Sequence, residues 1–429
     1  MAITEAYVFI EMPNESAPVL AGRLNIDPGN NTGSFIYGKS YLARTDAFAF
    51  DPINLPLTDS LQMIHGNDGV PTVLLDAGPD NWGQRLMQAL HSKHPENKLE
   101  LLLAGRGTGA GAISLSLSRA KPKSPPEYRP LSELTDLDNG IQRMIEEGVV
   151  TPEILRQLEP GSSMGGARPK SVVADENQRL WIAKFGRPDD IYDQVKTEEM
   201  CFRMMRDCGI ATAPTKLITP DNRSILLVER FDQPLVAGGS NRHFISGHAL
   251  TYRPRIKQND APFHFSYPKL ADIITQIGHP DDLQELYRRL IFNILSSNTD
   301  DHMRNHGFLK NVDDNFYRIS PAYDVVTQLS NSGLQAIGVG DEGRKGSIHN
   351  ALSACGRFRL SEAQAHDIIQ SVQEVTCKWQ EYAASVSLSD TDINILAGVL
   401  NRHESSDIDF SKVSSSLAQL STKTKGPSI

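Results

Sequence analysis

The segment Asn298-Thr-Asp-Asp-His-Met-Arg-Asn305 follows a stretch, Leu283 to Leu295, in which apolar residues recur at helical spacing. That spacing predicts an amphipathic helix with one buried stripe, so the segment should be a loop held by a rigid element. Asp300, His302 and Asn305 have the order D-x-H-x-x-N. A carboxylate here could orient a hydroxyl nucleophile, and the asparagine could hold Mg²⁺. The alternative is a polar loop in which Asp300 caps the next turn.

A second candidate metal ligand, Asp324, ends the segment Ile319-Ser-Pro-Ala-Tyr-Asp and lies nineteen residues beyond Asn305. Apolar residues flank a turn at Asp313-Asp-Asn, which predicts a β-hairpin that returns the chain. Asp324 would then face Asn305 across one ion. Taken alone, Asp324 is also explained as a helix N-cap before Val325.

Lys184 belongs to an alternating run, Trp-Ile-Ala-Lys-Phe, that predicts a β-strand. Alternation places Lys184 on the face opposite Trp181, where burial without an anionic partner would be costly. Glu198 is the natural partner, because it shares a predicted helix face with Cys201 and Phe202. A strand lysine paired with a helix glutamate is how protein kinases grip nucleotide phosphates. The alternative is an exposed edge-strand lysine and a solvated glutamate.

A segment rich in small residues, Gly161-Ser-Ser-Met-Gly-Gly-Ala-Arg-Pro-Lys170, precedes a predicted hairpin of the strands Lys170–Ala174 and Leu180–Phe185. Small residues let backbone N–H groups approach a phosphate closely, although a simple turn would have the same composition. It is not a Walker A loop, because proline precedes the lysine. A second glycine-rich stretch, Gly105 to Gly111, leads into a strand and not a helix, so a dinucleotide-binding interpretation fails there.

The composition is that of a globular protein with two or three domains: 429 residues, 39% hydrophobic and 22% charged. A net charge of -9 argues against a large footprint on nucleic acid. No stretch approaches the roughly 20 apolar residues of a membrane span, and Met1 to Glu15 lacks the basic region of a secretory signal. The four cysteines have no zinc spacing. We expect a cytoplasmic protein with free, mostly buried thiols.

Three regions follow one another along the chain. Residues 1–125 are predicted to be a β-rich subdomain, 126–235 a strand-rich lobe with one prominent helix, and 236–429 a mostly helical lobe. The elements expected besides those above are strands at Ala6–Ile10, Ser34–Tyr37, Ala112–Leu117 and Ser224–Glu229, and helices at Asn81–Ser92, Ser361–Trp379 and Asp390–Asn401. These motifs follow one another in the order found in protein kinases: glycine-rich loop, strand lysine, helix glutamate, linker strand, catalytic carboxylate and metal ligand. We therefore predict an α+β, bilobal, protein-kinase-like fold.

These motifs resemble those of the HipA family, the kinase toxins of bacterial HipBA-type toxin–antitoxin modules, over nearly the whole chain. The matching segments are Leu74–Arg85 (the family's N-terminal "LPD-WG" signature), Ser163–Lys170 (phosphate loop), Leu227–Asp232 (interlobe hinge), Thr299–Asn305 (catalytic segment) and Pro321–Asp324 (metal segment). Asp301 and Arg168 depart from the residues that are frequent at these positions in the family.

The resemblance implies an ATP- and Mg²⁺-dependent serine/threonine-protein kinase. Asp300 would be the catalytic carboxylate, and Asn305 and Asp324 would bind Mg²⁺. The residues implied to contact ATP are the loop residues Ser163, Met164, Gly165, Gly166 and Ala167, the pair Lys184 and Glu198, the backbone of Glu229 and Phe231, Asp232 at the ribose, His302, and Tyr323. Ser163, or alternatively Ser162, would be autophosphorylated, and the added negative charge would expel the loop and inactivate the enzyme.

The implied partners are a HipB-like antitoxin, a cellular protein substrate such as an aminoacyl-tRNA synthetase or another translation component, and DNA only through the antitoxin; no membrane is implied. Two other classes of function stay open. One is a catalytically silent, kinase-like binding or corepressor module, against which the intact Asp300, Asn305, Asp324 and Lys184 argue. The other is a small-molecule or lipid kinase, because D-x-H-x-x-N also resembles the phosphoinositide-kinase loop.

Overall fold

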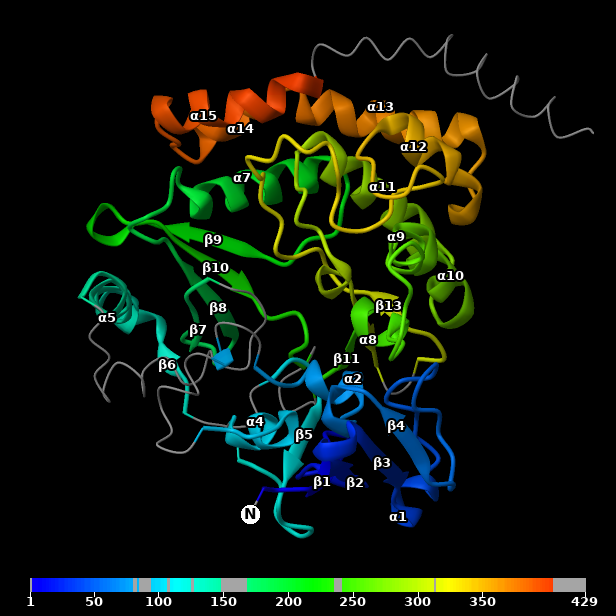
Figure 1. Cartoon of the computed structure of the whole chain (residues 1–429). Coiled ribbons are helices and arrows are strands. Elements are labelled where there is room, and N and C mark those ends of the chain that lie inside the picture. Colours follow the sequence, from blue (N-terminus) through cyan, green and yellow to red (C-terminus); the bar gives the residue numbers. More distant parts are fainter. Residues whose placement is uncertain are drawn as a thin grey trace, which may run out of the picture.

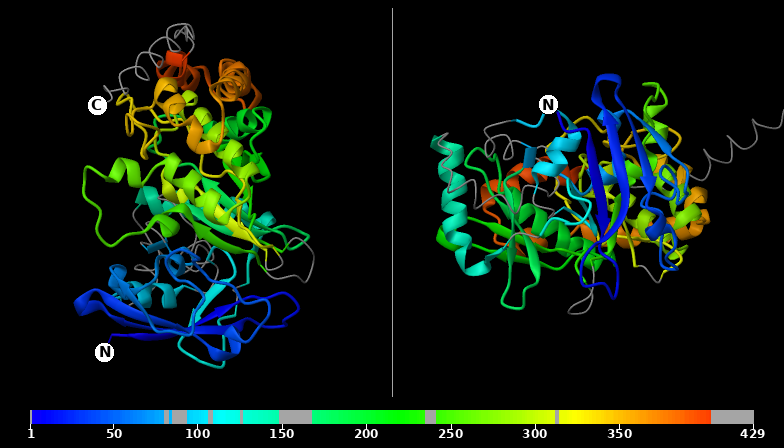
Figure 2. Two further views of the ribbon diagram at one scale, coloured as in Figure 1. Left: turned by 90° about the vertical axis from the view of Figure 1, so that its right-hand side faces the viewer. Right: turned by 90° about the horizontal axis from the view of Figure 1, so that it is seen from below.

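The structure, a computed structural model, describes residues 2–79, 83–84, 94–105, 109–124, 127–147, 168–234, 241–311 and 314–403. Within these ranges the chain forms three antiparallel or mixed sheets and a layer of helices (Figure 1). The N-terminal sheet lies at one end of the molecule and helices α13 to α15 lie at the other, as the side view shows (Figure 2). Sheets and helices are largely segregated along the chain, as the predicted α+β class requires.

The N-terminal region is a five-stranded antiparallel sheet of order β4-β3-β2-β1-β5. Its elements are β1 (Glu5–Ile10), β2 (Val19–Asp27), β3 (Thr32–Tyr37), β4 (Gln62–His65), β5 (Ile113–Ser116), α1 (Lys39–Leu42), α2 (Thr72–Leu75) and α4 (Lys98–Ala104). The three predicted strands are confirmed, and β2 and β4 add to them. The predicted helix Asn81–Ser92 lies almost wholly outside the described residues.

The second sheet has the order β6-β7-β8-β10-β9. It consists of β6 (Arg129–Pro130), β7 (Lys170–Ala174), β8 (Leu180–Phe185), β9 (Thr215–Ile218) and β10 (Ile225–Glu229), flanked by α5 (Leu134–Glu147) and α7 (Gln194–Asp207). The predicted hairpin of β7 and β8 is confirmed to the residue. The expectation of a single prominent helix is wrong, because α5 covers the face of β8 that carries Trp181. Leu134, Leu137 and Ile141 of α5 are buried there at helical spacing, so the signal was present in the sequence.

The C-terminal region is mostly helical, as predicted, but it also holds a small three-stranded sheet of order β11-β12-β13. Its strands are β11 (His243–Ser246), β12 (Gly307–Lys310) and β13 (Arg318–Ile319). Its helices are α8 (Gly247–Thr251), α9 (Ala261–His264), α10 (Tyr267–Ile277), α11 (Asp281–Leu295), α12 (Ile348–Ser353), α13 (Glu362–Thr376), α14 (Trp379–Ser385) and α15 (Asp390–Leu400). The hairpin of β12 and β13 lies between the two predicted metal ligands, as expected.

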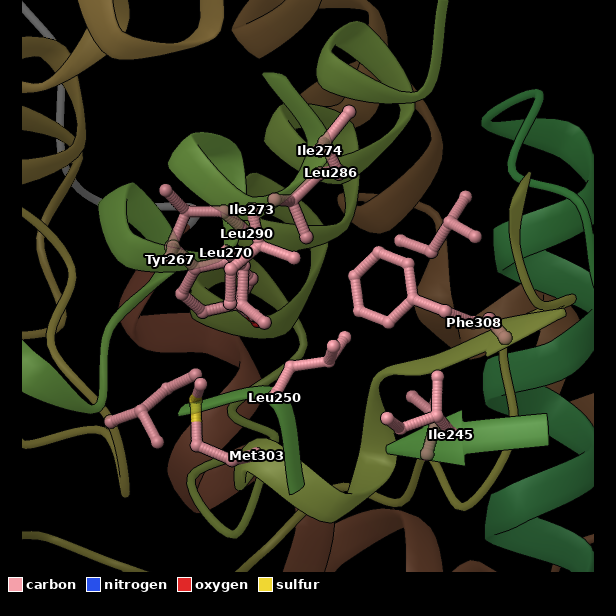
Figure 3. Close-up of a cluster of buried hydrophobic side chains, with 14 of the residues drawn as sticks. Ile245, Leu250, Tyr267, Leu270, Ile273, Ile274, Leu286, Leu290, Met303 and Phe308 are labelled. Atoms are coloured by element: carbon pink, nitrogen blue, oxygen red, sulfur yellow. The ribbon is translucent and has the colours of Figure 1, made fainter. Parts of the chain in front are cut away.

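A buried apolar cluster supports the segment that follows α11 (Figure 3). Leu286 and Leu290 of α11 pack in it with Ile273 of α10, and Met303 of the catalytic segment inserts its side chain into the same cluster. Fully burying an aliphatic side chain of this kind contributes about 1.5–3 kcal/mol. The loop that carries the predicted catalytic residues is therefore anchored on a packed core.

The N-terminal sheet is fixed to the helical region by buried polar contacts as well as by packing. Asp76 accepts hydrogen bonds from the backbone N–H and the hydroxyl of Ser246, at 2.7 and 2.8 Å. The ring Nε2 of His243 lies 2.8 Å from the carbonyl oxygen of Phe50. These contacts hold the first region against β11, directly behind the catalytic segment.

Two further expectations concern the whole chain. Among the described residues, no helix combines the length and the apolar character needed to cross a bilayer. All four cysteines are free thiols, and three of them are buried, Cys377 being the exposed one. The prediction of free, mostly buried thiols is confirmed.

Candidate active site

Lys184 of β8 connects two carboxylates that come from distant parts of the chain. Its Nζ lies 2.6 Å from Oε1 of Glu198 on α7 and 2.7 Å from Oδ1 of Asp324. The side chains of Lys184 and Glu198 are only 14% and 9% exposed, whereas that of Asp324 is 43% exposed. The predicted strand–helix pair is thus present, and Asp324 joins it from the open side.

Alternation along β8 explains why Lys184 points this way. Trp181, Ala183 and Phe185 are buried against α5 on one face, so Lys184 projects from the other face toward α7. On α7, Glu198 belongs to the buried stripe that includes Cys201, as predicted. The pair therefore follows directly from the two periodicities, two for the strand and 3.6 for the helix.

The three charges set each other's ionisation. Burial opposes the ammonium form of Lys184, but Asp324 and Glu198 outweigh it and raise the pKa of Lys184 above its usual value. Burial also opposes ionisation of Asp324, yet Lys184 and Lys170 hold the pKa of Asp324 well below its usual range. The pKa of Glu198 is raised, because burial outweighs the attraction of Lys184. Asp324 therefore stays a carboxylate at any physiological pH, as a metal ligand must.

The catalytic segment presents Asp300 to solvent and turns the next polar groups inward. Asp300 is exposed, and Asn305 is buried at the end of a short 3-10 turn, Met303–Asn305, whose N-cap is His302. Burial raises the pKa of Asp300; His302 lowers it and the carboxylates of Asp324 and Asp301 raise it. Asp324, His302 and Asp301 therefore lie near enough to Asp300 to act on its charge.

Asn305 and Asp324 have the chemistry that a hard cation needs. In the described part of the chain the side-chain amide of Asn305 makes no hydrogen bond within the protein, although the residue is buried. Asp324 has the left-handed backbone conformation, with a φ of 57°, which turns its carboxylate toward Lys184. No group of three His, Cys, Asp or Glu side chains converges within the described ranges. A metal ion would therefore be coordinated by one carboxylate, one amide oxygen and phosphate oxygens, a set of ligands that suits Mg²⁺.

The predicted nucleotide-base contacts lie where the second sheet joins the C-terminal region. Glu229 ends β10, and its N–H donates to the carbonyl of Pro214 at 2.9 Å, so its carbonyl is the group left for a base. The ring of Phe231 lies 5.3 Å from that of Tyr323, between centroids. Tyr323 also donates its hydroxyl hydrogen to the carbonyl of Arg304 at 2.5 Å, which ties it to the catalytic segment.

Asp232 has a different environment from the one that a ribose contact implies. Its carboxylate accepts two hydrogen bonds from Arg230, at 3.0 and 2.7 Å, and one from the backbone N–H of Gly111 at 2.7 Å. The side chains of Arg230 and Asp232 are 4% and 5% exposed. In this structure Asp232 fastens the N-terminal region to the hinge, and a ribose would have to displace these contacts. Part of the glycine-rich stretch before β5 is thus structural: a Cβ at Gly111 would lie 2.8 Å from the backbone of Phe244.

We expect Asp232→Ala to lower the stability of the fold far more than the affinity for ATP. Removing Asp232 takes away the buried carboxylate to which Arg230 donates two hydrogen bonds, and loss of one partner of a buried ion pair costs about 3–5 kcal/mol. Thermal unfolding and calorimetric titration with ATP measure the two effects, and Asp272→Ala, which removes an exposed partner of Arg357, is the matched control. A large loss of ATP affinity with unchanged stability would restore the ribose assignment.

Sequence reasoning missed two residues near this site, one charged and one polar. Lys170 on β7 is directly opposite Lys184 in the sheet register, is buried, and acts on both Asp324 and Glu198. Thr327, just beyond Asp324, is buried; its carbonyl accepts from the hydroxyl of Tyr192 at 2.6 Å. The pairing of Lys170 with Lys184 could have been found by aligning the two strands of the predicted hairpin about its turn.

The phosphate-loop prediction falls on residues that the structure does not describe. Ser162, Ser163, Met164, Gly165, Gly166 and Ala167 all lie outside the described residues. Arg168, the first described residue after them, is bound to Asp190 by both ends of its guanidinium group and donates to Gln194 at 2.7 Å. This departure from the resemblance thus serves an internal contact that anchors the end of the loop.

Two family descriptions match the chain. The HipA N-terminal domain matches residues 17–116, and the HipA-like C-terminal domain matches residues 162–379, slightly more than half of the chain. The chain belongs to the HipA family. The C-terminal match contains every predicted site residue from Ser162 to Asp324, so the site described above lies within the part of the chain that matches a HipA-like domain.

Solved structures support the fold. HipA of Shewanella oneidensis MR-1, solved in a complex with HipB and its operator DNA, matches with a TM-score of 0.66 and 18% identity over 90% of this chain and 95% of that chain. The predicted kinase-like bilobal fold of a HipA protein is therefore confirmed. The Helicobacter pylori proinflammatory kinase CtkA matches 56% of this chain and 90% of that chain at 16% identity, and its TM-score of 0.38 is too low to support an argument.

One curated relative also matches. A Haemophilus influenzae protein that bears only a provisional name as a kinase is 25% identical over 205 residues, 42% of this chain. The matched part spans 58% of the length of that relative. The activity named for it is therefore a proposal for this chain.

Proposed function

We propose that this HipA-family protein is an ATP- and Mg²⁺-dependent serine/threonine-protein kinase. The observation that carries the proposal is the position of Lys184, held between Glu198 and Asp324, whose carboxylate also acts on the charge of the exposed Asp300. A strand lysine, a helix glutamate and a metal-binding aspartate that meet at one point form the phosphate-gripping part of a kinase. A silent binding module has no need for two buried lysines that keep a half-exposed carboxylate ionised.

Each residue has a defined task in phosphoryl transfer. Lys184 would hold the α- and β-phosphates, and a phosphate oxygen that replaces Asp324 at its Nζ would release that carboxylate. Asp324 and Asn305 would then hold Mg²⁺, which neutralises charge on the transferring phosphate. Asp300 would orient the substrate hydroxyl and accept its proton, a task helped by its raised pKa. Glu229, Phe231 and Tyr323 would receive the base, and His302 would face the phosphates.

We expect Asp324→Ala to weaken Mg²⁺-dependent ATP binding more than Asn305→Ala does. A carboxylate supplies formal charge to the cation, whereas an amide oxygen supplies only a dipole. Calorimetric titration with ATP, with and without Mg²⁺, measures the difference. Without Mg²⁺, Asp324→Ala should bind ATP at least as well as the wild type, because Lys184 no longer has to exchange a carboxylate for a phosphate. Equal affinity of the wild type and Asp324→Ala in the presence of Mg²⁺ would contradict the metal role.

Autophosphorylation of the loop serine is the most direct test of the function. We expect Ser163, or alternatively Ser162, to accept phosphate from ATP within the protein itself, and the phosphate to lower ATP affinity by repulsion. Intact-mass analysis of the wild type and of Asp300→Asn, each incubated with Mg²⁺ and ATP, gives the result: a phosphate adduct on the wild type only. An adduct already present on both proteins before ATP is added would show that another kinase made it, and Ser163→Ala identifies the acceptor.

The partners follow from the same proposal. A HipB-like antitoxin would neutralise the kinase, as the assembly of the Shewanella oneidensis HipA with HipB suggests for this family. With a net charge of -9, contact with DNA would come through the antitoxin and not through this chain. The substrate would be a cellular protein, such as an aminoacyl-tRNA synthetase or another translation component. Phosphoproteomics after induced expression identifies it, and phosphate found on a metabolite or lipid alone would favour a small-molecule kinase.

A further inference from the structure

Asp301, the acid directly after Asp300, has no task in the proposed mechanism and is deeply buried. Its side chain is 4% exposed, whereas Asp300 is exposed, so the two acids face opposite sides of the segment. Oδ2 of Asp301 accepts one hydrogen bond from the hydroxyl of Tyr267 and one from Nε2 of His306, at 2.9 Å. Burying a carboxylate is costly unless such bonds compensate for lost water. The presence of a buried acid at this position therefore has to be explained by the groups that its carboxylate binds.

Tyr267 connects this carboxylate to the helical core. Its ring lies among the apolar side chains of α10 and α11 (Figure 3), and its hydroxyl oxygen accepts a hydrogen bond from Nδ2 of Asn293 at 2.8 Å. Oδ1 of Asn293 accepts from Nδ2 of Asn298 at 3.0 Å, at the start of the catalytic segment. The bonds thus form a continuous chain from Asn298 through both helices to Asp301. In a low-dielectric interior the members of such a chain reinforce one another.

His306 holds the other end of the segment. Its Nε2–H donates to Asp301, and its carbonyl accepts from the backbone N–H of Gly247 on α8 at 2.7 Å. Its Nδ1 is buried and has no hydrogen-bond partner within the described ranges, which fits the tautomer with the proton on Nε2. The bond between Asp301 and His306 spans the turn that carries His302 and Asn305. This bond joins the two ends of the turn and so holds it closed.

We propose that Asp301 is a positioning residue: through Tyr267 and His306, its carboxylate fixes the segment from Asp300 to Asn305 on the helical core. The proposal rests on the proposed kinase function. A displacement of about 1 Å in a reacting group can cost about 100-fold in rate. Lys184 belongs to a different element, so nucleotide binding should depend little on Asp301. Loss of the carboxylate should therefore slow transfer without releasing ATP.

The test separates the rate of transfer from binding. Asp301→Asn keeps the shape and one acceptor oxygen but removes the charge, and Tyr267→Phe removes only the hydroxyl group. We expect ATP turnover at saturation, counted as phosphate transferred to the protein or released, to fall about 10- to 100-fold in Asp301→Asn and less in Tyr267→Phe. The ATP affinity without Mg²⁺ should stay within about twofold. Asp272→Asn, an exposed acid on α10, is the control and should turn over like the wild type.

A merely structural role predicts another result. It would lower the unfolding temperature and the stoichiometry of ATP binding, while turnover per binding-competent site stayed at the wild-type value. That result, in either variant, overturns the proposal. If Asp301→Asn does not fold, Tyr267→Phe decides by the same comparison. A wild type that turns over no ATP overturns the proposed function and this inference with it, whereas an active wild type with an equally active Asp301→Asn overturns the inference alone.

Discussion

Asp300→Asn should abolish phosphoryl transfer while leaving the fold and the ATP affinity intact. The side chain is exposed and makes no contact within the described ranges that stabilises the chain, so the unfolding free energy should change by less than about 0.5 kcal/mol. The amide keeps the shape of the carboxylate but cannot accept the proton of a substrate hydroxyl. Loss of a positioned base costs about 10²–10⁴-fold in rate. Transfer of labelled phosphate from ATP, with thermal unfolding and ATP titration in parallel, measures all three quantities.

The control for Asp300→Asn is Asp59→Asn, which makes the same chemical change at an exposed acid of the N-terminal region. It should transfer phosphate at the wild-type rate. A folded Asp300→Asn protein of near-normal activity would remove Asp300 from the mechanism. Because Asp324 and Asp301 both repel a charge on Asp300, the neutral variant should also be no less stable at neutral pH than the wild type.

The sequence sufficed wherever periodicity alone decides the geometry. Alternation placed Lys184 on the face of β8 opposite Trp181, and helical spacing placed Glu198 on the buried stripe of α7, so the pair at 2.6 Å was predictable. The same rules predicted α11 as the support of the catalytic segment. The helix α5 has an equally regular pattern, because its buried residues Leu134, Leu137 and Ile141 recur at helical spacing, so it too was predictable.

The orientation of loop side chains was not predictable in the same way. Nothing local distinguishes Asp300 from Asp301, and only the approach of Tyr267 and His306 decides which acid is buried. Asp232 is a similar case, because its partner Gly111 comes from a stretch more than a hundred residues away, which the sequence could not place beside the hinge. Long-range contacts fix these side chains, and a single sequence contains no periodic trace of them.

Lys184→Met should have the second large effect, on catalysis and on stability together. It removes the cation that Glu198 and Asp324 share, so the grip on the phosphates is lost and transfer should fall about 10²–10³-fold. Leaving Glu198 buried beside a second carboxylate should lower the free energy of unfolding by about 2–3 kcal/mol. This loss is smaller than the roughly 3–5 kcal/mol expected for breaking a fully buried ion pair, because Asp324 is partly exposed. Lys39→Met, at an exposed lysine of α1, is the matched control and should change neither quantity.

The loss of stability in Lys184→Met should depend on pH with a definite sign. The pKa of Glu198 is already raised by burial, and removal of Lys184 takes away the main attraction that lowers it. A carboxyl group whose folded-state pKa exceeds its unfolded value of about 4.5 costs stability only as pH rises from that value through the folded pKa. The variant should therefore lose less stability near pH 5, where only the attraction of Lys184 for Asp324 is missing, than at pH 8, where Glu198 is also ionised without it. We expect the double variant Lys184→Met/Glu198→Gln to recover stability at pH 8. A difference between Lys184→Met and the wild type that does not depend on pH, or a double variant that recovers no stability, would show that Glu198 is not the group left uncompensated.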